Sequence, residues 1–205
     1  SGSGAVVLRL IEAETFVEQG GGLTLPGVGT GAPNVANLPL FDGPSLVVPS
    51  RVLVDPVARS LNVTDLTGTF RPGWPVFVFP NGSSQGGLSQ PMVQNMDGVF
   101  GDEIVVASDF GSVYFFKGNG AVETVDLAFN RSLTAPVGFR NAVGGWRVLV
   151  VDKLGWLRTW SWNAAVNAPP ELEQELFVDH ALPLPPAAGQ LTSGGGESLV
   201  VAFAD

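Results

Sequence analysis

The segment EIVVASDFGSVYFF, residues 103–116, contains two runs of strand-forming residues joined by a short polar turn. Valine, isoleucine, tyrosine and phenylalanine favour extended backbone, and the glycine can supply the positive φ that a tight hairpin turn requires. The aliphatic run at 104–106 is continuous rather than alternating, which predicts a strand covered on both faces. The segment therefore predicts a β-hairpin sandwiched between neighbouring sheets.

The same unit recurs along the chain. Five short aliphatic runs lie at intervals of roughly 44 to 52 residues, at 6–8, 52–54, 104–106, 148–150 and 199–201. A proline precedes each of the last four runs by 12 or 13 residues, at Pro39, Pro91, Pro136 and Pro186. Gly111 and Gly155 share one offset in two of the predicted hairpin turns. We interpret the repeat as a Pro-led strand, a small-residue loop, an aliphatic strand and an aromatic-rich strand, followed by a fourth strand.

A repeat of 40 to 50 residues with about four strands is typical of a β-propeller blade. We therefore expect an all-β fold, a β-propeller arc of about four four-stranded blades that belongs to a larger ring. The last four aliphatic runs should occupy equivalent places in successive sheets. The predicted units are 1–36 (partial), 37–88, 89–133, 134–183 and 184–205 (partial). Residues 169–182, which could hold a turn or two of helix, are interpreted as an insertion between strands.

Composition agrees with this fold class and limits the kinds of partner that the chain is expected to bind. The chain has 205 residues, 45% hydrophobic and only 14% charged, with 27 glycines and 16 prolines, which favours short strands and many turns. The net charge of −9, with Lys117 and Lys153 as isolated lysines, would repel a phosphate backbone, so we expect no nucleic-acid partner. No apolar run is long enough for a membrane span. The absence of cysteine excludes disulfides and thiolate metal sites.

The stretch FRPGWPVFVFPNGSSQGGLSQPMVQNMDGVFGDEIVVASDFGSVYFFKGNG, residues 70–120, resembles a blade of the FG-GAP/VCBS type. The consensus of that family contains Pro-Gly-Trp-Pro, Asp-x-Asp-Gly-Asp-Gly, Glu-Ile-Val-Val and Asp-Gly-x-Val-Tyr, and the match is strongest over 71–120. The resemblance, shared with quinoprotein-like repeats, implies a secreted protein that is extracellular, on the cell surface or periplasmic. We expect Trp74, in the Pro-Gly-Trp-Pro segment, to have a structural role at the start of a strand.

In that family the acidic loop can bind calcium through oxygens at alternate positions. Asn95 and Asp97 stand at the first two of these positions, but Val99 stands at the third and Phe100 replaces the following glycine. We expect no tightly bound cofactor or metal, and at most a weak calcium site formed by Asn95, Asp97 and Glu103. The favoured interpretation of the loop is a bend that joins two strands and carries solvated acids.

A stripe of tryptophans is the second candidate site. Alternation along a strand places Trp156, Arg158, Trp160 and Trp162 on one face. Trp156, Arg158 and Trp162 are the candidate ligand-binding residues, because aromatic rings with a guanidinium can stack a sugar or another protein. The favoured alternative is packing between blades, since Trp160 aligns with Phe116 of the preceding repeat. Trp162, at the end of the strand, is expected to be the most exposed of the three tryptophans.

Residues for catalysis are sparse in the sequence. His180 is the single histidine, and neither HExxH nor a P-loop motif occurs. We therefore favour a non-enzymatic extracellular or periplasmic module that serves as a scaffold or binds a protein or glycan partner. The alternative is part of a propeller enzyme, a quinoprotein-like dehydrogenase or a polysaccharide lyase, whose catalytic residues lie outside this chain.

The two ends of the chain both fall at a predicted second strand of a unit. Closure of a propeller commonly pairs complementary strands from the two ends within one blade. We therefore expect a segment of a larger propeller, completed by the remaining blades of its own polypeptide, by a second chain or by self-association. The alternative is a self-contained small propeller with one frayed end.

Overall fold

The computed structural model describes most of the chain in fifteen stretches. They are residues 5–8, 23–26, 28–29, 34–36, 38, 42–52, 58–78, 87–99, 101–109, 111–127, 132–163, 166, 168–179, 183–189 and 197–203. His180 and the aliphatic residues at 53–54 lie outside the described residues. Within the described part of the chain, no helix is long and apolar enough to cross a membrane.

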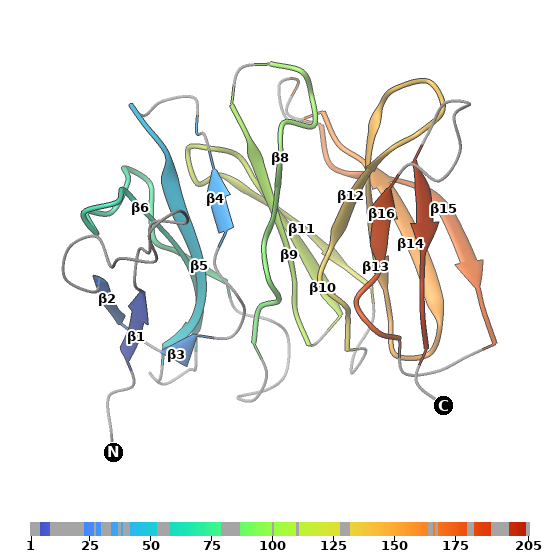
Figure 1. Ribbon diagram of the computed structural model, residues 1–205, viewed down its shortest axis with the longest axis horizontal. Helices are drawn as coiled ribbons and strands as arrows, with labels where there is room; N and C mark the ends of the chain where they lie inside the picture. The colour runs from blue at the N-terminus through green and yellow to red at the C-terminus, as the bar shows by residue number, and fades with distance from the viewer. Residues whose placement is uncertain are drawn as a thin grey trace, which may run out of the picture.

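The described strands form antiparallel sheets that follow one another along the chain (Figure 1). The middle sheet has the order β8-β9-β10-β11, with the bounds β8 (Met92–Gln94), β9 (Glu103–Ala107), β10 (Ser112–Phe116) and β11 (Val122–Asp126). The third sheet has the order β12-β13-β14-β15, with the bounds β12 (Val137–Arg140), β13 (Trp146–Val151), β14 (Trp156–Ser161) and β15 (Glu171–Phe177). Both are four-stranded meanders, as expected for propeller blades.

Three further sheets flank these two. The N-terminal sheet has five strands, β3 (Val28–Gly29), β4 (Asn34–Ala36), β5 (Ser45–Val52), β6 (Ala58–Thr64) and β7 (Val76–Val78). Both β3 and β4 pair with the same edge of β5, so together they take the place of one first strand. Two-stranded sheets lie at either end, formed by β1 (Ala5–Leu8) with β2 (Leu23–Pro26) and by β16 (Ala187–Gly189) with β17 (Ser198–Val200). We call the β16–β17 pair the end sheet.

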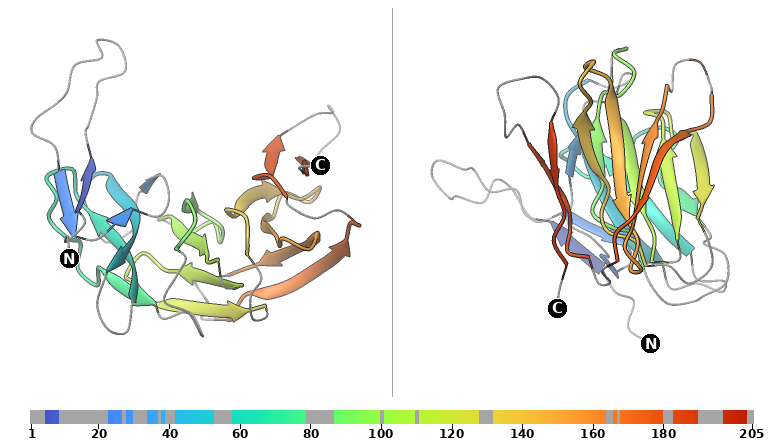
Figure 2. Two further views of the ribbon diagram at one scale, coloured as in Figure 1. Left: turned by 90° about the horizontal axis from the view of Figure 1, so that it is seen from below. Right: turned by 90° about the vertical axis from the view of Figure 1, so that its right-hand side faces the viewer.

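The sheets are arranged as an arc (Figure 2, left). The first strands β4, β8, β12 and β16 lie on its concave side and contact one another in that order. The outer strands β11 and β15 lie on the convex side. Each sheet thus runs outward from a common inner edge and packs face to face on its neighbours. The fold is an all-β propeller arc.

The strand pairing shows which aliphatic runs are equivalent. Residues at the same place in the first and second strands pair as Val93 with Ile104, Gly138 with Val148, and Ala188 with Leu199. The predicted equivalence of the runs at 104–106, 148–150 and 199–201 is therefore confirmed. In the N-terminal sheet the matching pair is Val35 with Leu46.

The prediction for residues 52–54 was wrong. The equivalent run in the N-terminal sheet is 46–48, whereas Val52 lies at the end of β5 and pairs with Ala58 at the hairpin. Both runs belong to one aliphatic-rich stretch, and strand propensity cannot tell which of them meets the first strand. The run at 6–8 lies in β1, and its place within a blade stays a prediction.

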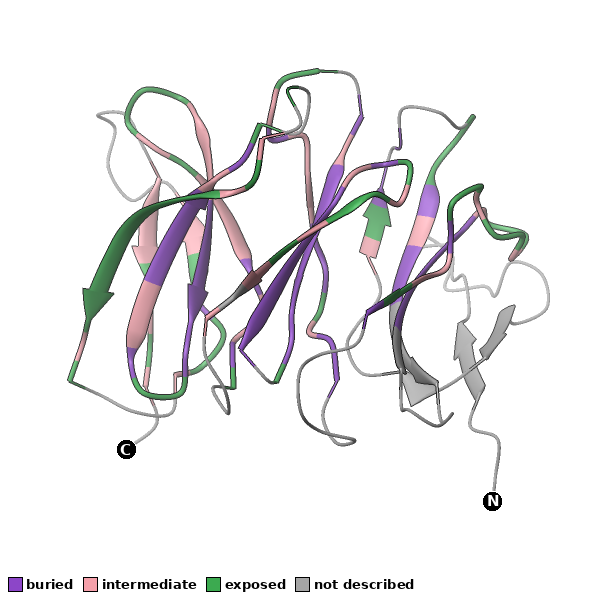
Figure 3. Ribbon diagram, turned by 180° about the vertical axis from the view of Figure 1, so that it is seen from behind, coloured by how far each residue is buried: buried purple, intermediate pink, exposed green. Residues whose placement is uncertain are grey.

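The β9–β10 hairpin of the middle sheet is buried on both faces, as its sequence predicted (Figure 3). Alternate residues of β9 face opposite neighbours. Ile104 and Val106 pack into a core shared with the N-terminal sheet, and Val105 and Ala107 pack into a core shared with the third sheet. Phe115 and Phe116 extend the two cores in the same alternating way. Burial of each such side chain contributes about 1.5–3 kcal/mol, so the middle sheet links its neighbours into one body.

The prediction of an insertion at residues 169–182 was wrong for the part that the structure describes, residues 169–179. Residues 171–177 are strand β15, the fourth strand of the third sheet, which pairs along β14. Every residue of β15 is exposed (Figure 3). The acidic ELEQELF sequence lacks the β-branched residues that indicate a strand. Pairing with β14, including Glu175 opposite Arg158, outweighs that low propensity.

The Pro-Gly-Trp-Pro segment lies between β6 and β7 of the N-terminal sheet and contacts the middle sheet. Trp74 is buried there as predicted, with its ring 5.6 Å from that of Phe116 and its Nε1 donating to the carbonyl of Gly118 at 3.3 Å. Gly73 has a φ of 87°, and a Cβ there would lie 2.3 Å from the carbonyl oxygen of Asn119. The segment therefore needs glycine for its conformation and for its close approach to the next sheet.

Candidate functional site

A pocket of about 420 Å³ lies on the concave side of the arc, between the first strands of successive sheets. We call it the concave pocket. Its lining comes from β4, β8, β12 and β16 and the residues just before them, together with Trp146, the first residue of β13, and Glu197, which precedes β17. No single blade forms it, because each contributes only one strand edge or one side chain to the wall.

The repeated prolines form part of the wall of the concave pocket. Pro91, Pro136 and Pro186 each stand immediately before a first strand, and all three are buried and line the pocket. A first strand has a sheet partner on one side only, so a residue with a free N–H at its start would present an unpaired donor. Proline has no N–H and fits that edge. The proline spacing in the sequence thus indicated this wall, although we interpreted it only as the start of strands.

Polar side chains surround the apolar part of the pocket. Asn34 donates from Nδ2 to the carbonyl of Pro91 at 3.1 Å, which joins the N-terminal and middle sheets. Gln90 is exposed and Gln94 is half-buried. Glu197 accepts from the backbone N–H of Arg140 at 2.8 Å through its carboxylate. These groups offer both donors and acceptors to a molecule in the pocket.

Trp146 is the aromatic residue of the pocket wall, at the start of β13. Its side chain is half-buried, and the guanidinium of Arg140 lies 4.8 Å from its ring centroid. Arg140 is anchored in turn, because its carbonyl accepts from the backbone N–H of Glu197 at 2.9 Å. The indole is therefore held between two sheets, with a cation over its ring. Sequence analysis did not single out Trp146, since its role depends on contacts between blades.

The predicted calcium residues lie together in the connection between β8 and β9. Asn95 Oδ1 accepts from the N–H of Gly98 at 2.7 Å, and Asp97 Oδ1 accepts from the N–H of Val99 at 2.8 Å. Within the described residues, no three or more histidine, cysteine, aspartate or glutamate side chains form a group suited to a metal ion. The oxygens cap a bend, and this arrangement fits a structural turn better than a calcium site.

Glu103, the first residue of β9, stabilises this loop through a hydrogen bond. Its side chain is 7% exposed, and its Oε2 accepts from the backbone N–H of Met96 at 2.8 Å. The pKa of Glu103 is raised to about 7. Burial is the largest cause, the N–H of Met96 opposes it, and the nearby carboxylates of Asp97 and Asp102 add to it. Glu103 is thus a buried, titratable side chain that holds the loop through its hydrogen bond with Met96.

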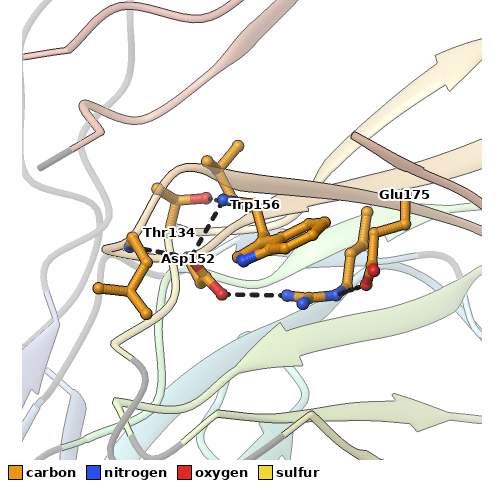
Figure 4. Close-up of polar contacts among 7 residues, drawn as sticks. Thr134, Asp152, Trp156 and Glu175 are labelled. Carbon is orange, nitrogen blue, oxygen red and sulfur yellow. Dashed lines mark hydrogen bonds and ion pairs between the residues drawn. The ribbon is translucent and has the colours of Figure 1, made fainter. Parts of the chain in front are cut away.

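The candidate stripe of Trp156 and Arg158 is an internal network rather than an open surface (Figure 4). The guanidinium of Arg158 lies 3.1 Å from the carboxylate of Asp152 and 2.5 Å from that of Glu175. It also lies 5.4 Å from the ring centroid of Trp156, which packs against Phe177. Arg158 is buried, so these partners occupy the group that was expected to meet a ligand.

Trp162 was expected to be the most exposed of the three tryptophans, and this was wrong. Its side chain is 4% exposed, its Nε1 donates to the carbonyl of Ala168 at 3.0 Å, and its ring meets Phe115 edge-on at 5.4 Å. The chain after β14 folds back over the ring, which the end of a strand in the sequence cannot reveal. Trp160 is buried between blades, as the alternative interpretation predicted, and Trp156 is half-buried.

Comparisons with known proteins do not identify a family for this chain. No model of a protein family matches the chain, and no curated protein matches it. Among solved structures, the chain is similar to one in the crystal structure of BBS1N in complex with ARL6DN, soaked with mercury. The TM-score is 0.34 at 10% identity, over 86% of this chain and 77% of that chain. The propeller assignment therefore depends on the strand order and on the packing of the sheets.

Proposed function

We propose that this chain is a non-enzymatic β-propeller module that binds a protein segment or a glycan in the concave pocket. The proposal is based on one observation: amide side chains, buried prolines and one indole line the same pocket at the inner edge of the arc. Ligand sites are commonly concave, largely apolar and furnished with a few fixed polar groups. The concave pocket is concave and carries such fixed polar groups, and polar and apolar surface contribute about equally to its wall.

The chemistry of the lining suits an uncharged, hydrogen-bonding ligand. Gln90 and Gln94 each carry two donors and a carbonyl acceptor, which can pair with peptide groups or with sugar hydroxyls. Trp146 offers apolar surface to an aliphatic side chain or to a sugar ring. Because the polar groups come from different sheets, the pocket is held in shape by the packing of the blades.

The proposal extends to location and family. The resemblance to FG-GAP/VCBS repeats supports a protein that is extracellular, on the cell surface or periplasmic. The net charge of −9 supports a neutral or basic partner over nucleic acid. The remaining blades of a larger propeller, on this polypeptide or on another chain, would extend the same concave surface.

A matched pair of variants tests the proposal. Gln90 is exposed and lines the pocket, so Gln90→Trp should fill part of it while the protein stays folded. Gln174 is exposed on the convex strand β15, so Gln174→Trp makes the same change elsewhere. A displayed peptide library and a glycan array are probed with the wild type and both variants. Ligands that Gln90→Trp loses and Gln174→Trp keeps support the proposal; ligands kept by both variants contradict it.

A further inference from the structure

A second pocket, of about 280 Å³, lies between the middle and third sheets. We call it the rim pocket, because the β8–β9 and β12–β13 connections that contribute to it lie along the same edge of the two sheets, at the top of Figure 1. The lining residues used below are Met96, Asp97, Trp146, Arg147, Trp162 and Glu171. Trp146 also lines the concave pocket.

The inner part of the rim pocket is apolar and aromatic. Trp146 and Met96 pack with the core between the middle and third sheets, and Trp162 belongs to that core. The contact between Arg140 and the Trp146 ring shows that a cation is already bound to this indole within the protein. Indole rings attract ammonium and guanidinium groups through their quadrupole, more strongly where water is partly excluded.

Carboxylates dominate the charge of the outer part. Asp97 and Glu171 both line the pocket, and Arg147 is the single cation among the described residues of the lining. The Nε of Arg147 is ion-paired with Glu173, and its guanidinium also donates to the carbonyl of Trp146 at 2.8 Å. The positive charge of Arg147 is thus matched within the third sheet, so Asp97 and Glu171 leave the pocket with excess negative charge.

We propose that the rim pocket binds the ammonium group of a lysine side chain from a protein partner. The ammonium would lie between the indoles and the carboxylate of Asp97, and the aliphatic stem would pack on Met96 and Trp146. Charge complementarity favours this occupant, because a neutral sugar could donate hydrogen bonds to the carboxylates but could not offset their excess negative charge. The rim pocket shares Trp146 with the concave pocket, but its other lining residues are distinct, and the proposal does not depend on the function proposed for the concave pocket.

The probe is Nα-acetyl-lysine amide, with the Nε-acetylated compound as its neutral counterpart. Titration is followed by the indole N–H resonances of Trp146 and Trp162 in NMR spectra. The charged probe should shift both resonances in a saturable way, and the neutral counterpart should not. Asp97→Asn should weaken binding about fivefold, because a partly exposed charge contact is lost. Its amide oxygen can still accept from the N–H of Val99, so the loop is kept.

Two further variants make the result unambiguous. Asp179→Asn removes the same charge from an exposed position outside the pocket lining and should change the affinity less than about twofold. If Asp97→Asn lowers the melting temperature, Glu171→Gln replaces it as the variant that removes a negative charge from the pocket. Equal shifts from the neutral probe, equal losses in the Asp97 and Asp179 variants, or stronger shifts from methyl glucoside would each overturn the proposal. Gln90→Trp should leave lysine binding intact, so failure at one pocket is distinguishable from failure at the other.

Discussion

Gly138 on β12 lies directly against Met92 on β8: a Cβ at position 138 would stand 3.1 Å from the Met92 sulfur. This contact joins two first strands at the inner edge of the arc, where both residues line the concave pocket. Gly138→Ala should destabilise the protein by about 1 kcal/mol, because the flexible thioether can move only partly aside. Chemical denaturation measures the change.

The control for this change is Gly189→Ala on β16. Nothing lies within 4 Å of a Cβ built there, so the variant should be neutral or slightly stabilising. If both alanines had the same effect, the close approach at Gly138 would have no energetic consequence.

Gly73→Ala should be more damaging than Gly43→Ala. Both glycines have positive φ, 87° and 76°, so both variants incur backbone strain of about 1 kcal/mol. Only Gly73 also faces the carbonyl of Asn119, at 2.3 Å from an added Cβ. We expect Gly73→Ala to lower the free energy of unfolding by a further amount of about 2 kcal/mol, the usual cost of overpacking a well-packed site. Thermal melts that gave equal losses for the two variants would contradict the described contact between the Pro-Gly-Trp-Pro segment and the middle sheet.

Glu103→Gln should change the dependence of stability on pH. The folded pKa of about 7 lies above the ordinary value of 4.5, so the folded state binds more protons between these values. The wild type should therefore lose stability as the pH rises from about 4.5 to 7, by up to about 3 kcal/mol. Glutamine keeps an acceptor for Met96 without a charge, so the variant should show a flatter profile and exceed the wild type at pH 8. A profile like that of the wild type would show that Glu103 is not the group responsible.

Arg158→Met should destabilise the third sheet because it leaves a buried carboxylate without its ion-pair partner. Asp152 is fully buried, and its Oδ2 lies 3.1 Å from Arg158. Breaking a buried pair from one side costs about 3 kcal/mol. The double variant Arg158→Met with Asp152→Asn should recover part of the loss, because the asparagine oxygen can still accept from the N–H groups of Leu154 and Trp156. If urea denaturation shows no recovery of stability in the double variant, the loss in Arg158→Met comes from packing and not from the unpaired charge.

Local signals in the sequence predicted the local parts of this fold. Gly111 and Gly155 have φ of 85° and 91°, as their hairpin turns required, and the hairpin at 103–116 is buried on both faces. The register of strand pairing could not be predicted from such local signals. The runs at 46–48 and 52–54 are equally aliphatic, and only pairing with β4 distinguishes them.

The sites depend on contacts that a single repeat does not encode. The concave pocket takes its prolines from three sheets and its indole from Trp146, which sequence patterns did not mark. Trp156 and Arg158 do share a face, as alternation predicted, but Asp152 and Glu175 occupy the guanidinium. Trp162 is covered by the chain at Ala168, which lies beyond the strand and outside its pattern.

The central claim is that the concave side of the arc, formed by the first strands, is the binding surface. Hydrogen–deuterium exchange with a ligand selected from the peptide library or the glycan array tests it most directly. Binding should slow exchange at residues 90–94 and 137–140, which include β8 and β12. The outer strands β11 and β15 should exchange as in the free protein. Protection confined to β11 and β15 would contradict the claim and place binding on the convex side.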